Sequence, residues 1–334
     1  MTSRELVVDS LEFRGPARVP RHFWTLPWAE LTWPAELAAI RRRFPDDIVT
    51  APAFLREPLR TLGQQYEPGV FIDEWGCRFE NAQRGIIGQV KEARVRSWDD
   101  VDAVRPPREK LSVDLDAVDD FCGRSDAFVL ANTWARPFEL LQFLRGSETL
   151  YIDLAERPPG LFRLLGKIHA FFKEELELWA ATEVDALVFA DDWGGQSGLL
   201  VSPDLWRAIF KPVYRDYVEI AHRNGKYAFM HSDGHIAAIL PDLVEIGLDA
   251  LNSQLFCMDI AGIGRRFAGK LTFWGEIDRQ RLLPYGTPAD IAAAVRTVHR
   301  ALWRQGGAIA QCEFGIGARP ENVAAVFEAW ESLT

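Results

Sequence analysis

Residues 227–233 read Tyr227-Ala-Phe-Met-His-Ser-Asp233, an apolar run that ends in residues able to do chemistry. Seven other short segments have the same form, with residues such as Val, Ile, Phe and Leu first and polar or charged residues last. Near-continuous apolar runs that alternate with helical patterns are typical of buried parallel strands joined by crossover helices. The eight segments are 17–24, 69–75, 127–133, 186–193, 227–233, 250–254, 271–278 and 308–313.

Polar residues at the C-terminal ends of such strands mark the active face of a (β/α)8 barrel, while the opposite face serves stability. We therefore expect an α/β enzyme with one domain over residues 1–334, a single (β/α)8 TIM barrel. Residues 1–66 are rich in proline, which breaks long helices, and we expect an irregular segment that contains the first strand. Further along, Pro158-Pro159 predicts the start of a helix over 160–182.

The composition excludes several classes of protein. The net charge of -10, from 38 basic and 48 acidic residues, argues against a nucleic-acid partner. No apolar run approaches the roughly 18 residues of a membrane span, and the N-terminus lacks the pattern of a secretory signal. Four cysteines in 334 residues do not make a disulfide framework. We expect a cytoplasmic protein that acts on a small molecule, without a membrane partner.

The segment 227–233 and the last segment carry a candidate metal site. Residues two apart in a strand point to the same side, so His231 and Asp233 can converge on one point. Imidazole and carboxylate together suit Zn²⁺, although a hydrogen bond between them explains the spacing equally well. Cys312 would face the barrel mouth and complete three ligands with an open fourth position, the pattern of catalytic zinc.

Carboxylates and aromatic residues at the other segment ends are candidates for catalysis and substrate binding. Neighbouring acids in a strand point to opposite sides, so at most one of Asp191 and Asp192 faces the centre. Tryptophans at strand ends are as typical of the core as of an apolar substrate pocket. The catalytic candidates are Asp192, Glu276, Asp278 and Asp73. The substrate-binding candidates are His22, Trp24, Trp75, Trp193, Gln196, Asn252 and Trp274.

Several of these motifs resemble the uroporphyrinogen decarboxylase superfamily, from about residue 65 to the end of the chain. The resemblance implies a barrel of the uroporphyrinogen decarboxylase type. The decarboxylases bind their polycarboxylate substrate through an arginine-rich motif, which is missing around residues 20–24, so we do not expect porphyrinogen decarboxylation. The stretches that carry the resemblance are 73–77, 191–196, 231–234, 241–249, 273–278, 306–312 and 320–322.

A second branch of the superfamily contains zinc-dependent, corrinoid-linked methyltransferases, whose metal sits on a His-x-Cys pair and a distant Cys. In this chain His231 and Cys312 match that pattern, Asp233 replaces the middle cysteine, and Glu276 is a candidate fourth ligand. The resemblance implies methyl transfer between a small, for example O-methylated, substrate and a corrinoid or thiol acceptor. It also implies zinc, a corrinoid carried by a separate protein, and a homodimer.

Two alternatives are open at this point. One is a metal-free lyase, similar to the decarboxylases, that acts on a smaller carboxylic acid and uses Asp73 or Asp192 to stabilise a protonated intermediate. The other is a barrel that only binds a ligand or partner. Metal content separates the methyltransferase from the lyase.

Overall fold

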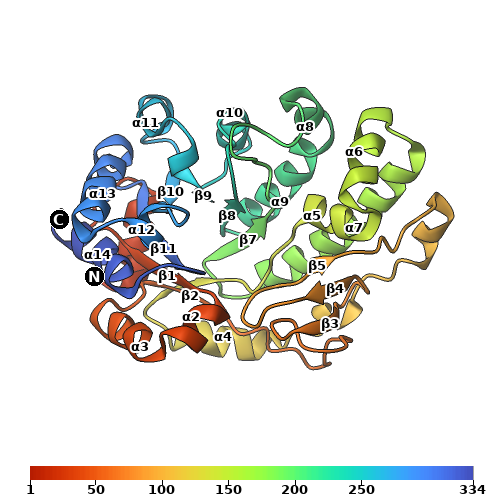
Figure 1. Cartoon of the computed structure of the whole chain (residues 1–334), viewed down its shortest axis with the longest axis horizontal. Coiled ribbons are helices and arrows are strands. Elements are labelled where there is room, and N and C mark those ends of the chain that lie inside the picture. The colour runs from red at the N-terminus through yellow and green to blue at the C-terminus, as the bar shows by residue number, and fades with distance from the viewer. Residues whose placement is uncertain (334) are drawn as a thin grey trace.

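The computed structural model describes residues 1–333, in which eight parallel strands form a nearly closed barrel surrounded by helices (Figure 1). The order around the barrel is β1-β11-β10-β9-β8-β7-β6-β2. The amide of Asp47 donates to the carbonyl of Arg21 at 2.9 Å and links the two end strands. The predicted (β/α)8 TIM barrel is confirmed. Its strands are β1 (Arg21–Thr25), β2 (Ile48–Thr50), β6 (Phe128–Leu130), β7 (Ala186–Ala190), β8 (Tyr227–Ser232), β9 (Ala250–Ser253), β10 (Thr272–Trp274) and β11 (Ala308–Phe314).

The helices cover the outside of the barrel, and many of them start where the sequence provides a cap or a proline. The helix predicted after Pro158 begins at Pro159 and is the longest in the described chain. The α-helices are α1 (Ser3–Leu11), α2 (Pro27–Thr32), α3 (Pro34–Arg43), α4 (Leu115–Gly123), α5 (Pro137–Arg145), α6 (Ser147–Glu156), α7 (Pro159–Ala180), α8 (Pro203–Ile209), α9 (Lys211–Arg223), α10 (Leu240–Glu245), α11 (Ile260–Phe267), α12 (Leu282–Tyr285), α13 (Pro288–Leu302) and α14 (Pro320–Glu331). Short 3-10 helices are η1 (Trp98–Ala103), η2 (Arg108–Leu111) and η3 (Leu255–Cys257). None of the helices in residues 1–333 is long and apolar enough to cross a membrane.

Helix α1 closes the end of the barrel at which the strands begin. Its N-terminus is capped by Thr2, and Val7 and Leu11 pack against the apolar side chains that fill the barrel. Ser10 donates a hydrogen bond to the carbonyl of Ala308, the first residue of β11. The other end, at which the strands finish, is called the barrel mouth below. In barrels of this type functional sites lie at that end. The interior side chains are Ile48, Phe128, Leu130, Ala186, Val188, Phe229, Ala250, Trp274 and Ile309.

The second barrel strand is not the one that the sequence predicts. Segment 69–75 forms β3 (Gly69–Ile72), which pairs antiparallel with β4 (Arg78–Asn81). Strand β5 (Gln89–Val90) completes a separate three-stranded sheet, at the lower right of Figure 1. The second barrel strand is β2, inside the segment expected to be irregular. At three residues β2 is too short to show a periodic pattern.

Candidate metal centre

Three side chains from neighbouring strands meet at the barrel mouth. His231 lies in β8, Asp233 follows that strand directly, and Asp192 follows β7. Nε2 of His231 lies 3.4 Å from Oδ1 of Asp192 and 3.7 Å from Oδ1 of Asp233. One ligand atom from each residue lies within 4.8 Å of the others. Parallel pairing of β7 with β8 places Ala190 opposite His231, which brings the two strand ends together.

Asn252 of β9 sets the orientation of the His231 ring. Nδ1 of His231 donates to Oδ1 of Asn252 at 2.6 Å, and His231 and Asn252 are paired in the register of β8 and β9. The amide of Asn252 also donates to the carbonyl of Trp274, so its own position is determined. Because Nδ1 carries the proton, Nε2 is free to bind a metal; ligating histidines are commonly held in this way by a second group.

Arg279 joins three carboxylates on the other side of the centre. It donates to Oδ2 of Asp233, lies 3.5 Å from Oε1 of Glu276, and lies 3.2 Å from Oε2 of Glu313. Arg279 thus leaves Oδ1 of Asp233 available, and that atom is buried without a hydrogen-bond partner. Buried polar atoms in folded proteins have a binding partner, so this carboxylate oxygen is expected to bind a hydrogen-bond donor or a cation when a ligand occupies the site.

The charges of the centre shift the pKa values of its members in opposite directions. Burial opposes the charged form of His231, but the hydrogen bond that its ring donates to Asp192 and the charges of both aspartates raise its pKa to about 9. Burial likewise opposes the charged form of Asp192, yet His231 keeps the pKa of that carboxyl below its ordinary value. Without a metal, His231 is therefore an imidazolium at neutral pH, and the carboxylate of Asp192 stabilises its charge.

Glu276 is the buried acid of the centre. Its side chain is nearly inaccessible, and its Oε2 has no hydrogen-bond partner. Burial raises the pKa of Glu276 to about 8, although the charge of Arg279 lowers it. The carboxyl therefore holds a proton at neutral pH and can act as a donor.

Cys312 does not reach this centre, and its prediction as a ligand is wrong. Side chains alternate along β11, where Ile309 faces the barrel interior and Glu313 reaches Arg279. The side chain of Cys312 points to the other side of β11 and lies fully buried in the apolar layer between strands and helices, opposite Phe23 of β1. Asp192, predicted as a catalytic residue, takes the place that Cys312 was expected to fill in the trio.

Of the neighbouring acids Asp191 and Asp192, one belongs to the metal centre, as expected. Asp191 is buried and accepts from the amides of Phe138 and Glu139 at the start of α5, while Asp192 faces the centre. The predicted catalytic residue Asp73 follows β3 rather than a barrel strand. Its Oδ1 accepts from the amides of two residues in its own turn, which stabilises that turn.

Three of the predicted substrate-binding residues belong to one aromatic cluster beside the metal centre. Nδ1 of His22 accepts from the indole nitrogens of Trp24 and Trp274, both at 3.1 Å. Trp24 also packs against His231, with the ring centroids 5.5 Å apart, and against Trp134. His22, Trp24 and Trp274 thus form a wall beside the metal centre, of which Trp274 is fully buried.

Trp75 and Trp193 are core residues, contrary to the prediction that they bind substrate. Trp75 packs edge-on against Phe171 of α7 at 5.2 Å between centroids. Trp193 has no exposed surface, stacks on Phe138 at 4.0 Å, and donates to the hydroxyl of Tyr214. The residue after Asp192 points away from the mouth because successive side chains of an extended chain point to opposite sides.

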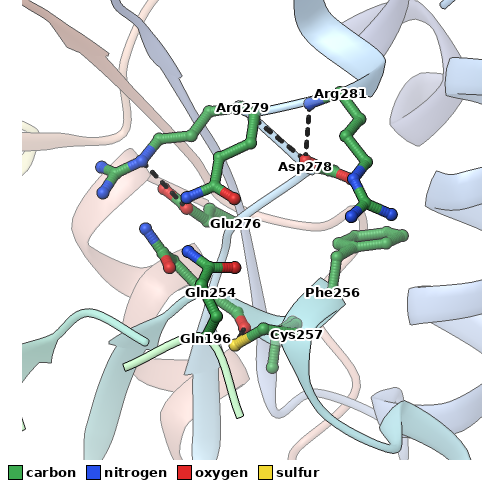
Figure 2. A pocket seen from close by; sticks show the side chains of 10 residues that line it. Gln196, Gln254, Phe256, Cys257, Glu276, Asp278, Arg279 and Arg281 are labelled. Atoms are coloured by element: carbon green, nitrogen blue, oxygen red, sulfur yellow. Dashed lines mark hydrogen bonds and ion pairs between the residues drawn. The ribbon is translucent and has the colours of Figure 1, made fainter. Parts of the chain in front are cut away.

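Several cavities lie beside the metal centre, and two of them contain residues with a possible role in its chemistry. The larger, called the mouth cavity, has a volume of about 580 Å³ and is lined by Asp192, His231 and residues of the β3–β4 region. The smaller, about 230 Å³, is lined by Glu276 and Arg279, with the predicted residues Gln196 and Asp278 on its wall (Figure 2). Oδ1 of Asp278 accepts from the amides of Gln280 and Arg281, so this acid stabilises its turn at the cavity rim.

Arg279 and Arg136 are residues of the mouth that sequence reasoning missed. Arg136 and Trp134 line the mouth cavity, and Nη1 of Arg136 lies 3.1 Å from Glu139. A pattern in the sequence could have pointed to Arg279. Carboxylates predicted at the ends of three strands require a counter-cation if they converge, and Arg279 directly follows one of those ends.

The donor set of Asp192, His231 and Asp233 fits a divalent metal. Zinc bonds of about 2.0–2.1 Å in a tetrahedron place neighbouring ligand atoms about 3.3 Å apart, close to the 3.4 Å between His231 and Asp192. One imidazole and two carboxylates make a harder set than thiolates, so the site suits zinc or a similar ion with oxygen-bearing ligands. The unpartnered Oδ1 of Asp233 is the third donor.

Comparison with known proteins places this barrel in a family and beside one solved structure. A family model described as uroporphyrinogen decarboxylase (URO-D) matches residues 70–333. The fold is similar to that of a methyltransferase from Methanosarcina mazei, with a TM-score of 0.72 and 16% identity, over 100% of this chain and 99% of that chain. At this identity the likeness shows the fold alone. No curated protein matches the sequence.

Proposed function

We propose that this chain, which belongs to the uroporphyrinogen decarboxylase (URO-D) family, is a metal-dependent methyltransferase. It moves a methyl group between a small methylated compound, such as an O-methylated one, and a corrinoid or thiol acceptor. The observation that carries the proposal is the trio of Asp192, His231 and Asp233 at the barrel mouth, with one oxygen of Asp233 buried and unpartnered. The similarity in fold to a methyltransferase supports it.

The three residues of the trio would hold zinc, and each is already oriented. Asn252 directs Nε2 of His231 toward the two aspartates, and Arg279 occupies Oδ2 of Asp233. When bound, zinc supplies Lewis acidity that polarises the heteroatom of the substrate. The trio is preorganised because its partners are buried and hydrogen-bonded.

Other residues of the mouth would orient the substrate and handle protons. The wall of Trp24 and Trp134 shields one side of His231 from water. Glu276 holds a proton at neutral pH and would give it to a leaving heteroatom. Asp278 and Gln196 lie on the wall of the smaller cavity, where they would contact a ligand. A corrinoid would come on a separate protein that approaches this mouth.

The alternative metal-free lyase is less well supported by the charges of the mouth. A carboxylic acid substrate needs uncommitted cations, but Arg279 lies among three carboxylates and Arg136 is paired with Glu139. The acids Asp73 and Asp192 proposed for this reaction are themselves bound to backbone amides or to His231. An anionic substrate would therefore enter an acidic site.

Metal content tests the proposal. Purified protein is loaded with zinc and dialysed, and zinc is measured by mass spectrometry for the wild type, Asp192→Asn, His231→Ala and Cys312→Ala. We expect about one zinc per chain in the wild type and in Cys312→Ala, and loss in the other two. A wild type that retains no zinc would contradict the metal site. Methyl transfer is then followed by the spectral change of cobalamin on mixing with candidate donors; no change with any acceptor would contradict the activity.

A further inference from the structure

The wall of the mouth cavity carries more acids than bases. Its volume, about 580 Å³, falls within the range of roughly 300–1,000 Å³ typical of sites for drug-sized ligands, so it exceeds the needs of a one-carbon compound. Apart from His231, the bases on the wall are Lys110 and Arg136. The acids on the wall are Asp73, Glu74, Glu139, Glu175, Asp191 and Asp192.

Both bases are already paired, and Glu74 shares its nearest cation, Lys110, with Glu175. Nζ of Lys110 lies 3.1 Å from Glu175 and 4.0 Å from Glu74, so its closer partner is Glu175. Arg136 is paired with Glu139. Burial, together with the charge of Glu74, raises the pKa of Glu175. This part of the wall is an acidic patch that shares one lysine.

Glu175 provides a second, independent sign of a ligand. Its side chain is 1% exposed, it lines the cavity, and its Oε2 has no hydrogen-bond partner. An unpaired buried carboxyl oxygen costs free energy. A ligand that brings an N–H group to this patch would satisfy that oxygen.

The cavity wall also carries five aromatic rings. Trp134 is the most exposed of these rings, at 37%, and it packs against Trp24 beside the metal centre. The faces of aromatic rings attract cations, most strongly when water is excluded. An aromatic wall with an acidic end therefore suits a ligand with an apolar body and a positive charge. The lining rings are Tyr66, Phe71, Phe79, Trp134 and Trp179.

We propose that the mouth cavity binds a cationic methyl donor, an aromatic-sized compound with an ammonium group. The ammonium group lies toward Glu74 and Glu175, and the methylated heteroatom lies toward Asp192 and His231. The assignment of the reacting end rests on the proposed methyltransferase function, whereas the preference for a cation rests on the cavity alone. The same charges disfavour the polycarboxylate substrates of the decarboxylases.

Binding of three ligands with one aromatic body tests this preference. 2-(4-Methoxyphenyl)ethylamine is a cation at neutral pH, 2-(4-methoxyphenyl)ethanol is its neutral analogue, and (4-methoxyphenyl)acetate is an anion. Affinities are measured by titration calorimetry with the full chain, with and without zinc. We expect the amine to bind about 10-fold more tightly than the alcohol, equivalent to about 1.4 kcal/mol, and the carboxylate to bind most weakly. The preference should shrink as salt is added.

Two variants locate the preference in the acidic patch. Glu74→Gln removes one negative charge of the acidic patch and should reduce the preference for the amine over the alcohol to about 2-fold or less. Glu67→Gln makes the same chemical change at an exposed residue that is paired with Arg84 and lies outside the cavity wall, and it should keep the preference. Equal binding of amine and alcohol, tighter binding of the carboxylate, or no binding of the amine would overturn the proposal.

Failure of the cationic site can be distinguished from failure of the proposed methyltransferase function. Calorimetry needs no methyl acceptor, so a protein that binds the amine but transfers no methyl group would retain the cationic site and lose the activity. A protein that transfers methyl groups from the alcohol's ether as readily as from the amine's would retain the activity and lose the cationic site.

Discussion

Two buried histidines at the same barrel mouth have opposite electrostatic surroundings. His22 in β1 accepts hydrogen bonds from two indoles, and burial lowers its pKa to about 3. His231 in β8 faces two aspartates, which overcome burial and raise its pKa to about 9. The same residue type in two strands of one barrel is thus a neutral support for the aromatic wall in one case and a charged group that can bind a metal in the other.

The comparison shows that the residue type and its place in a barrel strand do not decide its role. Nδ1 of His22 is committed to Trp24 and Trp274, so this histidine stabilises the wall. Nδ1 of His231 is committed to Asn252, which leaves Nε2 to the site. What differs is whether the neighbouring strands supply indole donors or carboxylates.

A pH titration of the metal-free protein should show the largest difference between the two histidines. We expect His231 to titrate near pH 9 and His22 to stay neutral down to about pH 3. NMR spectra of the two imidazoles, assigned through His22→Ala and His231→Ala, measure both values. Titration of both rings near pH 6.5 would contradict the description of the two surroundings.

The two histidines should also change the stability of the fold with pH in opposite directions. The pKa of His231 in the folded state is raised, so its contribution is fully present below about pH 6.5 and is lost as pH rises through 9. The pKa of His22 is lowered, so its contribution is present above about pH 6.5 and is lost as pH falls toward 3. Urea unfolding of each alanine variant against pH separates the two contributions.

Removal of His231 should abolish tight metal binding, whereas removal of His22 should not. We expect His231→Ala to weaken zinc binding by about 100-fold or more, because even the groups that orient metal ligands are worth about 10–100-fold. His22→Ala leaves two indole N–H groups unpaired and should lower stability while zinc affinity changes little. Competition with a chromophoric chelator gives both affinities, and an equal loss in the two variants would remove the distinction.

Asn252 should act on the metal through the ring that it orients. We expect Asn252→Ala to weaken zinc binding by about 10–100-fold, and Asn252→Asp to restore most of it because a carboxylate also accepts from Nδ1. Chelator competition measures affinity, and the Nδ1 proton resonance of His231 reports the lost hydrogen bond. If Asn252→Ala binds zinc as the wild type does, the ring does not need this partner.

Cys312 should have the smallest effect, and only on stability. Because its thiol is buried in the apolar layer outside the barrel, Cys312→Ala should lower the free energy of unfolding by about 1 kcal/mol. Zinc content should remain that of the wild type. Chemical denaturation and mass spectrometry check the two values, and zinc loss in this variant would restore Cys312 as a ligand.

Most of the fold could be predicted because the pattern of buried strands is local. Seven of the eight predicted segments contain barrel strands, whereas β3 belongs to the small antiparallel sheet. A strand such as β7, with five buried residues, carries its signal in its own sequence. Strand β2 has only three residues and is recognised by its pairing with β6. Local patterns cannot supply a pairing between distant segments.

The candidate site could be predicted in part, for a similar reason. The spacing of His231 and Asp233 placed both on one side of the strand end, and the trio includes them. The face on which Cys312 lies depends on the register of β11, which the sequence does not reveal. Asn252 and Arg279 act through residues 21 and 46 positions away in the chain, distances over which only the folded barrel brings side chains together.

The sequence by itself determined the class of fold and the pair of His231 and Asp233 at the barrel mouth. Hydrophobic periodicity and the two-residue repeat of a strand act between near neighbours, so these features are readable from the chain. Only the tertiary structure decided that Asp192 rather than Cys312 joins the pair, that Arg279 neutralises the strand-end acids, and that His22 is neutral. Strand register, burial and the meeting of distant charges set these outcomes.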